Sequence, residues 1–240
     1  MSLKRIKTIN TITNSTLLII LFVFGLGLRH GLDLDHIATI DSITRTLRAN
    51  NQLSKRVGFL FSLGHGLVVI ILSVIISNGM IRAQFPTWLE PLGSYISIFF
   101  LLVFGLITLY SSLLHKKKLH PPTTTSIGGF FALTLKRYNA FWITLIGALF
   151  AFSFDTFSQV ALFSISMSSS NHWYFAALLG LFFMLGMMAT DGLNGFMVSL
   201  LIQRADKFSF LISRLLGFFI ACFSLILGLL SLYAELNKLG

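Results

Sequence analysis

The sequence is poor in charged residues, cysteine and proline, and each scarcity limits what the chain can be. Charged residues make up 11% of its 240 residues, against roughly a quarter in soluble domains. The single cysteine, Cys222, excludes an internal disulfide and a metal site built from several thiolates. The four prolines fall in residues 86–91 and 121–122, and these stretches are the clear linkers because proline breaks helical hydrogen bonding.

Apolar residues dominate what remains. The chain is 55% hydrophobic with a mean hydropathy of +0.84, and Phe alone contributes 25 residues. Several apolar stretches reach the roughly 20 residues that a helix needs to cross a hydrocarbon core of about 30 Å. The sequence therefore predicts an all-α fold, a polytopic transmembrane helix bundle that occupies residues 1–240 as a single domain.

About six membrane helices can be drawn along the chain. The first is expected to be one long helix, because the apolar stretch of residues 17–28 is too short for a comfortable span of its own. The alternative divides this helix near Arg29, which gives a seventh helix and a cytoplasmic N-terminus. The expected helices cover residues 15–47, 57–80, 92–114, 140–167, 173–203 and 208–236.

Positive charge is concentrated in alternate loops. The net charge is +10, and 12 of the 18 Lys and Arg residues form three clusters between expected helices. The clusters are Arg45, Arg48, Lys55 and Arg56; Lys116, Lys117, Lys118, Lys136 and Arg137; and Arg204, Lys207 and Arg214. Cytoplasmic loops of membrane proteins have this bias, so the basicity indicates orientation in the bilayer and not nucleic-acid binding. We expect a multi-pass protein of the cell membrane.

Acidic residues are few, yet they gather in the expected spans. A charge within a membrane helix costs at least about 2.5 to 3.5 kcal/mol on insertion scales, so its presence calls for a compensating role. Five of the eight acidic residues lie in or beside expected helices: Asp33, Asp35, Asp41, Asp155 and Asp191.

The densest polar group lies in residues 30–41 of the first expected helix, with two His and three Asp. On a continuous helix His30, Asp33 and His36 follow one another about 60° apart, so they share one face. Asp41 rejoins that face, whereas Asp35 lies off it, where it suits an acceptor for an imidazole N–H. Nitrogen and oxygen ligands without thiolate match nickel, cobalt, zinc or iron(II) better than calcium or magnesium. The alternative is that these groups pair only to stabilise the bundle.

Three other expected helices offer partners. His65 lies between Gly64 and Gly66, which permit close helix contact, and it is as well explained by packing as by metal binding. The helix over 140–167 contains Asp155 and Gln159, four residues apart on one face. The helix over 173–203 contains Asp191 and Asn194 in a glycine-rich polar interruption, a feature that often marks transporter substrate sites.

Taken together, these segments resemble the motifs of the nickel/cobalt transporter (NiCoT) family. Residues 29–37, RHGLDLDHI, are similar to its hallmark helix R-H-A-x-D-A-D-H-I, which contains the pattern H-x4-D-H. Residues 58–69 resemble its F-S-L-G-H-S-x-V-V segment, residues 154–156 its G-F-D-T-A-S/T-E element, and residues 186–195 its G-M-x-L-x-D-T-x-D-G element. The matches occur in this order and cover residues 24–195.

The resemblance implies a role for each matching residue. By it, His30, Asp35 and His36 form the selectivity core, His65 contributes further, and Asp155 and Asp191 are supporting polar groups. Three positions depart from the family: Gln159 replaces a Glu, Asn194 an Asp and Gly66 a Ser. Two anionic groups are thereby missing, which bears on metal preference, affinity and proton coupling. Family members typically have eight helices, so we expect a compact or divergent relative that lacks the first and last.

The expected function is a permease for Ni²⁺ or Co²⁺, with the ion as transported substrate and no cofactor. Uptake driven by the membrane potential or an ion gradient is favoured, since no Gly-x4-Gly-Lys-Ser/Thr phosphate loop is present. An enzyme is not expected, because His-Glu-x-x-His is absent. The alternatives are an exporter of the same metals and a metal-binding subunit or sensor that does not translocate alone.

Overall fold

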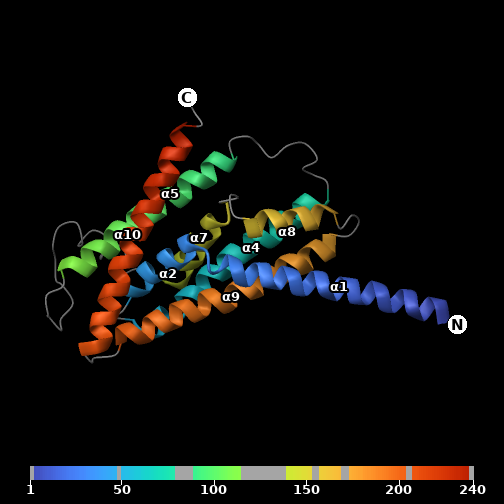
Figure 1. Ribbon diagram of the computed structural model, residues 1–240, viewed down its shortest axis with the longest axis horizontal. Coiled ribbons are helices and arrows are strands. Elements are labelled where there is room, and N and C mark those ends of the chain that lie inside the picture. Colours follow the sequence, from blue (N-terminus) through green and yellow to red (C-terminus); the bar gives the residue numbers. More distant parts are fainter. Residues whose placement is uncertain are drawn as a thin grey trace.

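The chain folds into a bundle of helices. The computed structural model describes residues 3–47, 50–78, 89–114, 139–152, 157–168, 173–203 and 207–237, and within them every regular element is a helix. The helices are α1 (Leu3–His30), α2 (Leu34–Thr46), α3 (Asn51–Ser54), α4 (Val57–Ser77), α5 (Leu89–Leu114), α7 (Ala140–Phe150), α8 (Phe157–Ser168), α9 (Trp173–Gln203) and α10 (Lys207–Asn237) (Figure 1). The predicted all-α fold is confirmed.

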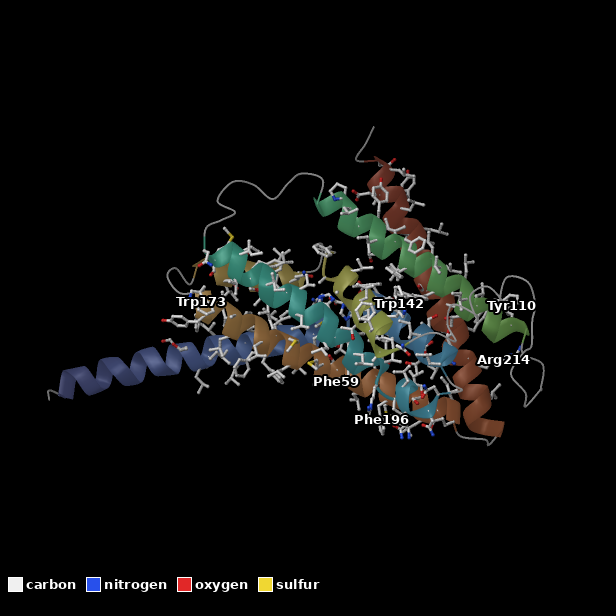
Figure 2. All side chains as sticks on the ribbon, turned by 180° about the vertical axis from the view of Figure 1, so that it is seen from behind. Phe59, Tyr110, Trp142, Trp173, Phe196 and Arg214 are labelled. Atoms are coloured by element: carbon white, nitrogen blue, oxygen red, sulfur yellow. The ribbon has the colours of Figure 1, made fainter. Side chains whose placement is uncertain are left out.

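Helix length and apolar character fit a multi-pass membrane protein. Four described helices, α4, α5, α9 and α10, are long and apolar enough to cross a bilayer, and α1 with α2 makes a fifth span if the bent pair is counted once. The shorter apolar helices α7 and α8 cover the remaining expected segment. Large side chains such as Phe59, Trp142 and Phe196 project outward from the bundle (Figure 2), as expected for a surface that faces lipid.

The first expected span is not one continuous helix. The prediction of a single helix over residues 15–47 is wrong, because α1 ends at His30 and α2 begins at Leu34 with its axis bent by 56°. The backbone of Gly31 lies so close to α9 that an added Cβ would collide with the Thr190 side chain and lie 2.9 Å from the Met187 carbonyl oxygen. Asp33 then takes an extended conformation, φ −63° and ψ 144°, at the N-cap of α2.

The expected helix over 140–167 is also divided. Helix α7 ends at Phe150, residues 151–152 form a turn, and α8 begins at Phe157. The side-chain amide of Gln159 on α8 donates a 2.8 Å hydrogen bond to the carbonyl oxygen of Ala151. This bond satisfies a carbonyl that the end of α7 leaves without a helical partner.

Helices α4 and α9 form the centre of the bundle, packed closely against each other, with α1 and α7 on either side. The approach is closest at Gly58, where a Cβ would overlap the backbone of Asp191. Helices α5 and α10 pack together and meet the rest of the bundle partly through α2. One apolar cluster gathers around Phe183 from α1, α4, α8 and α9, and a second around Phe61 and Phe150 from α2, α4, α5 and α7.

Replacing Gln159 with Leu tests the link between α7 and α8. The change keeps the side chain's bulk but removes the donor to Ala151, leaving a carbonyl unsatisfied, so we expect the free energy of unfolding to fall by about 1–3 kcal/mol. Denaturation of the purified protein in detergent measures this. Val160→Ala, on the exposed side of the same helix, is the control and should change stability much less; equal stability of the Gln159 variant and the wild type would contradict the assignment.

Candidate metal centre

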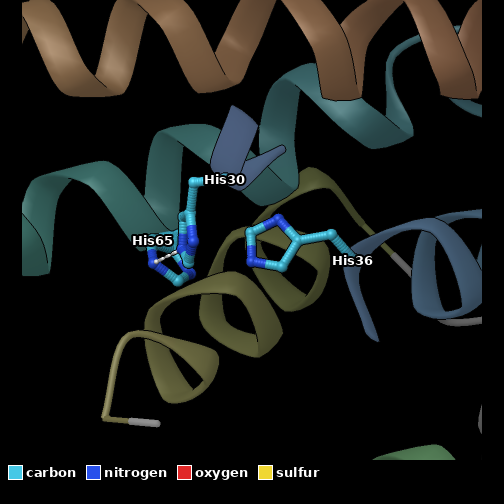
Figure 3. Close-up of side chains that lie close together, drawn as sticks. All are labelled: His30, His36 and His65. Carbon is cyan, nitrogen blue, oxygen red and sulfur yellow. Dashed lines mark hydrogen bonds between the residues drawn. The ribbon is translucent and has the colours of Figure 1, made fainter. Parts of the chain in front are cut away.

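Three histidine side chains converge inside the bundle. His30 is the last residue of α1, His36 lies in the first turn of α2, and His65 lies in the middle of α4. Each is only 1% exposed, and one ring nitrogen from each can be chosen so that all three lie within 4.8 Å of one another. Figure 3 shows the rings facing a common space. Their centroids are 4.7 to 5.0 Å apart.

The separation of two of these nitrogens suits a shared ligand. The Nε2 atoms of His30 and His65 are 3.2 Å apart. Two nitrogens bound to one ion at about 2.0–2.1 Å each, at angles between square and tetrahedral, lie about 2.9–3.4 Å apart. The pair, which also lies at hydrogen-bond distance, therefore has the separation that two ligands of one ion require. The His36 nitrogen lies within 4.8 Å of the other two and would have to move closer to bind the same ion.

Carboxylates fix the orientation of two of the rings. His30 Nδ1 lies 3.0 Å from Oδ2 of Asp33, and His36 Nδ1 lies 3.0 Å from Oδ2 of Asp191 on α9. A carboxylate only accepts hydrogen bonds, so each Nδ1 carries a proton, and in the neutral ring each Nε2 then keeps its lone pair. This is the arrangement by which proteins orient metal-binding histidines.

Asp191 is the most buried group of the centre. It is 0% exposed, and its Oδ2 also accepts a 2.6 Å hydrogen bond from the hydroxyl of Ser62. Its Oδ1 has no hydrogen-bond partner among the described residues. Ser62 was not predicted as a site residue, although it matches the first Ser of the motif F-S-L-G-H-S. Its spacing of three from His65, which places both on one side of α4, is the signal that could have found it.

Apolar rings enclose the histidines. The His30 ring lies 5.2 Å from that of Phe183, and the His36 ring lies 5.0 Å from Phe61 and 6.3 Å from Phe150. These three Phe residues belong to the two apolar clusters, so the histidines lie where the clusters meet. In such surroundings an electrostatic interaction is stronger than it would be in water.

Arg29 marks the side of the centre nearest the surface. Its guanidinium donates a 2.6 Å hydrogen bond to Ser158 and lies 3.7 Å from Asp33 Oδ1, and it covers the ring of Phe157 at 5.7 Å. Its side chain is 55% exposed and that of Asp33 is 20% exposed. Asp33 thus connects the buried His30 to a more open region.

The other predicted site residues lie apart from the three rings. Asp35 was expected to accept an imidazole N–H, but its Oδ1 accepts the backbone N–H of His36 at 3.0 Å. Asp41 was placed on the face of His30 by assuming a continuous helix; here it is held by Arg45 at 2.6 and 2.9 Å. Asn194 is half-buried and its Nδ2 has no hydrogen-bond partner in the described part of the chain.

Two further expectations concern the segment around α8. Gln159 is directed to the Ala151 carbonyl, and Asp155 lies outside the described residues. A part in the ion's path for Asp41, Asp155, Gln159 and Asn194 stays a prediction.

Comparison with known proteins decides the family. The model of the family NicO, described as high-affinity nickel-transport protein, matches residues 16–235. The chain belongs to this family. The resemblance to nickel/cobalt transporters found in the sequence is thereby confirmed, and this is a transporter family whose members are multi-pass membrane proteins, not enzymes.

Two curated nickel transporters are similar to this NicO protein over most of its length, and a cobalt transport protein is similar over a shorter part. The nickel transporter NixA of Staphylococcus aureus is 29% identical over 205 residues, 73% of this chain and 59% of the relative. The high-affinity nickel-transport protein NixA of Helicobacter pylori is 33% identical over 198 residues, 72% of this chain and 60% of the relative. The cobalt transport protein NhlF of Rhodococcus rhodochrous is 41% identical over 56 residues, 23% of this chain and 16% of the relative.

The NicO chain spans about three-fifths of the length of the first two relatives. No solved structure matches it.

Asp191→Asn tests the orientation of His36 in this NicO protein. The amide can donate where the carboxylate only accepted, so the ring loses a charged partner and we expect nickel affinity to fall about 10- to 100-fold. Calorimetric titration of the purified protein with Ni²⁺ measures the affinity. Glu235→Gln, a change at a buried carboxyl on α10, is the control and should bind as the wild type does; unchanged affinity in Asp191→Asn would count against the centre.

Asp41→Asn tests whether the Asp41–Arg45 pair stabilises the fold. Asp41 is 0% exposed and its partner's side chain only 14%, so removing one charge leaves the other poorly solvated and should lower the free energy of unfolding by about 3 kcal/mol. Denaturation in detergent measures the loss. The double change Asp41→Asn with Arg45→Gln should recover part of it, and no loss in the single variant would contradict this role.

Proposed function

We propose that this chain carries Ni²⁺ or Co²⁺ across the cell membrane and binds the ion at His30, His36 and His65 on the way. The observation that carries the proposal is the convergence of three buried imidazoles, one nitrogen from each within 4.8 Å of the others. Lone pairs that face one another repel unless a proton or a cation lies between them. A proton shared by the Nε2 atoms of His30 and His65, 3.2 Å apart, accounts for that one contact, whereas a cation would account for the convergence of all three rings.

The donor set supports a divalent transition metal. Imidazole is a good ligand for nickel, cobalt and zinc, whereas calcium and magnesium require more oxygens. The relatives named as nickel transporters and as a cobalt transport protein favour nickel and cobalt within this group. Three protein ligands leave coordination positions open, which an ion needs if it is to be released again.

The charges of the centre also favour a divalent cation. Neutral imidazoles bring no charge, but Asp33 and Asp191 each contact one ring from behind at 3.0 Å. Two carboxylates balance two positive charges in a region from which water is largely excluded, where an unbalanced charge would be costly. Arg29, at 3.7 Å from Asp33, partly offsets that carboxylate and lies on the more exposed side.

The membrane potential can drive uptake. With the inside negative, each 100 mV contributes about 2.3 kcal/mol per charge, hence about 4.6 kcal/mol for a divalent ion. Inward movement through the centre then needs no ATP.

Uptake of radioactive nickel into proteoliposomes tests the proposal. With an inside-negative potential we expect the wild type to accumulate nickel, and His30→Ala, His36→Ala and His65→Ala to lose at least about tenfold in initial rate, because each removes one of three ligands. His172→Ala, a histidine outside the proposed set, is the control. Equal uptake by all variants would reject the centre, and flux only under the opposite potential would favour an exporter.

A further inference from the structure

Ser62 is a fully buried polar residue whose bonding exceeds what its helix requires. It is 0% exposed, one turn before His65 on α4. Its hydroxyl lies 2.9 Å from the carbonyl oxygen of Gly58, the usual acceptor for a serine within a helix. It also lies 2.6 Å from Asp191 Oδ2, an acceptor on a different helix that hydrogen-bond satisfaction alone does not demand.

The carboxylate is the stronger of the two acceptors. A hydroxyl has one proton to donate, so Gly58 and Asp191 compete for it. The bond to Asp191 is shorter, and an ionised acceptor makes a stronger bond than a neutral carbonyl. The proton of Ser62 is therefore directed mainly at Asp191 Oδ2.

The same oxygen receives the imidazole of His36. Oδ2 of Asp191 accepts from Ser62 and from His36 Nδ1, while Oδ1 has no hydrogen-bond partner among the described residues. Without Ser62, the contact with His36 would be the one hydrogen bond to this carboxylate among the described residues, and the carboxylate could turn together with the ring. With Ser62, a second helix holds the same oxygen, which limits the rotation of Asp191 and with it the direction of the His36 ring.

Close packing of the helices makes this reach possible. The backbone of Gly58, one turn before Ser62, lies directly against the backbone of Asp191. At this spacing a short hydroxyl side chain on α4 reaches the carboxylate on α9. Helix α4 thus carries His65 to the centre and, through Ser62, orients His36 from the opposite side of its ring.

We propose that Ser62 is a positioning residue of the metal centre, which holds Asp191 so that His36 turns its Nε2 toward the ion. This rests on the proposed function, since it assigns Ser62 a part in the same site. If Ser62 has this positioning role, replacing it should change the metal affinity although Ser62 does not contact the metal.

The test compares Ser62→Ala, Ser62→Cys and Ser62→Thr. Nickel uptake into proteoliposomes gives KM and maximal rate, and titration with Co²⁺ gives affinity and the visible absorption of the bound ion. We expect Ser62→Ala to raise KM and weaken cobalt binding at least about tenfold and to alter the cobalt spectrum. Thr keeps the hydroxyl and should restore KM to within about threefold of the wild type, whereas Cys keeps the volume but donates weakly and should fall between Thr and Ala.

Ser73→Ala is the matched control, because Ser73 lies on the same helix, is also 0% exposed and has no side-chain hydrogen-bond partner among the described residues. It should show wild-type KM and cobalt spectrum. Wild-type KM and spectrum in Ser62→Ala would overturn the proposal, and if that variant does not fold, wild-type values in Ser62→Cys would do so.

The design separates this proposal from the proposed function. If the wild type binds cobalt but carries neither nickel nor cobalt, transport is wrong, while the cobalt titrations still decide the role of Ser62. If the wild type carries nickel and Ser62→Ala carries it with the same KM, transport stands and the role of Ser62 is rejected. If the wild type binds neither cobalt nor nickel, both are wrong.

Discussion

The bend between α1 and α2 is the constraint on which the centre depends. His30 ends one helix and His36 lies in the first turn of the next, and the 56° change of axis turns both rings toward His65. On a straight helix the two rings would be about 120° apart around the axis. The break between α1 and α2 removes backbone hydrogen bonds that lipid cannot replace. Such interruptions are tolerated where protein buries them. Here the backbone of Gly31 lies against α9.

Asp33 shows how the break and the centre share one residue. It occupies the N-cap of α2, but its side chain makes no capping hydrogen bond and instead accepts from His30. Asp35 provides the compensation, because its Oδ1 accepts the backbone N–H of His36 in the first turn of α2. The two acidic residues of the motif therefore have different tasks, one toward an imidazole and one toward the helix end.

Much of this arrangement could be predicted from the sequence, and the failures have physical causes. Apolar stretches of sufficient length indicated the membrane helices, and the gathering of His30, Asp33 and His36 indicated where polar chemistry would lie. The prediction of a continuous first helix was wrong because hydropathy indicates how long an apolar stretch is and not whether its helix axis bends. Nothing in the sequence around Gly31 indicates its contact with α9. The partner of His36 could not be derived by spacing, since Asp191 is 155 residues away in the chain and only the fold brings them together.

X-ray absorption at the nickel edge, on the protein loaded with one Ni²⁺ per chain, tests the three-histidine centre most directly. We expect nitrogen neighbours at about 2.0–2.1 Å and the outer scattering pattern of imidazole rings from three histidines, with no sulfur. A nickel ion surrounded only by oxygen, or one with a sulfur neighbour, would contradict it.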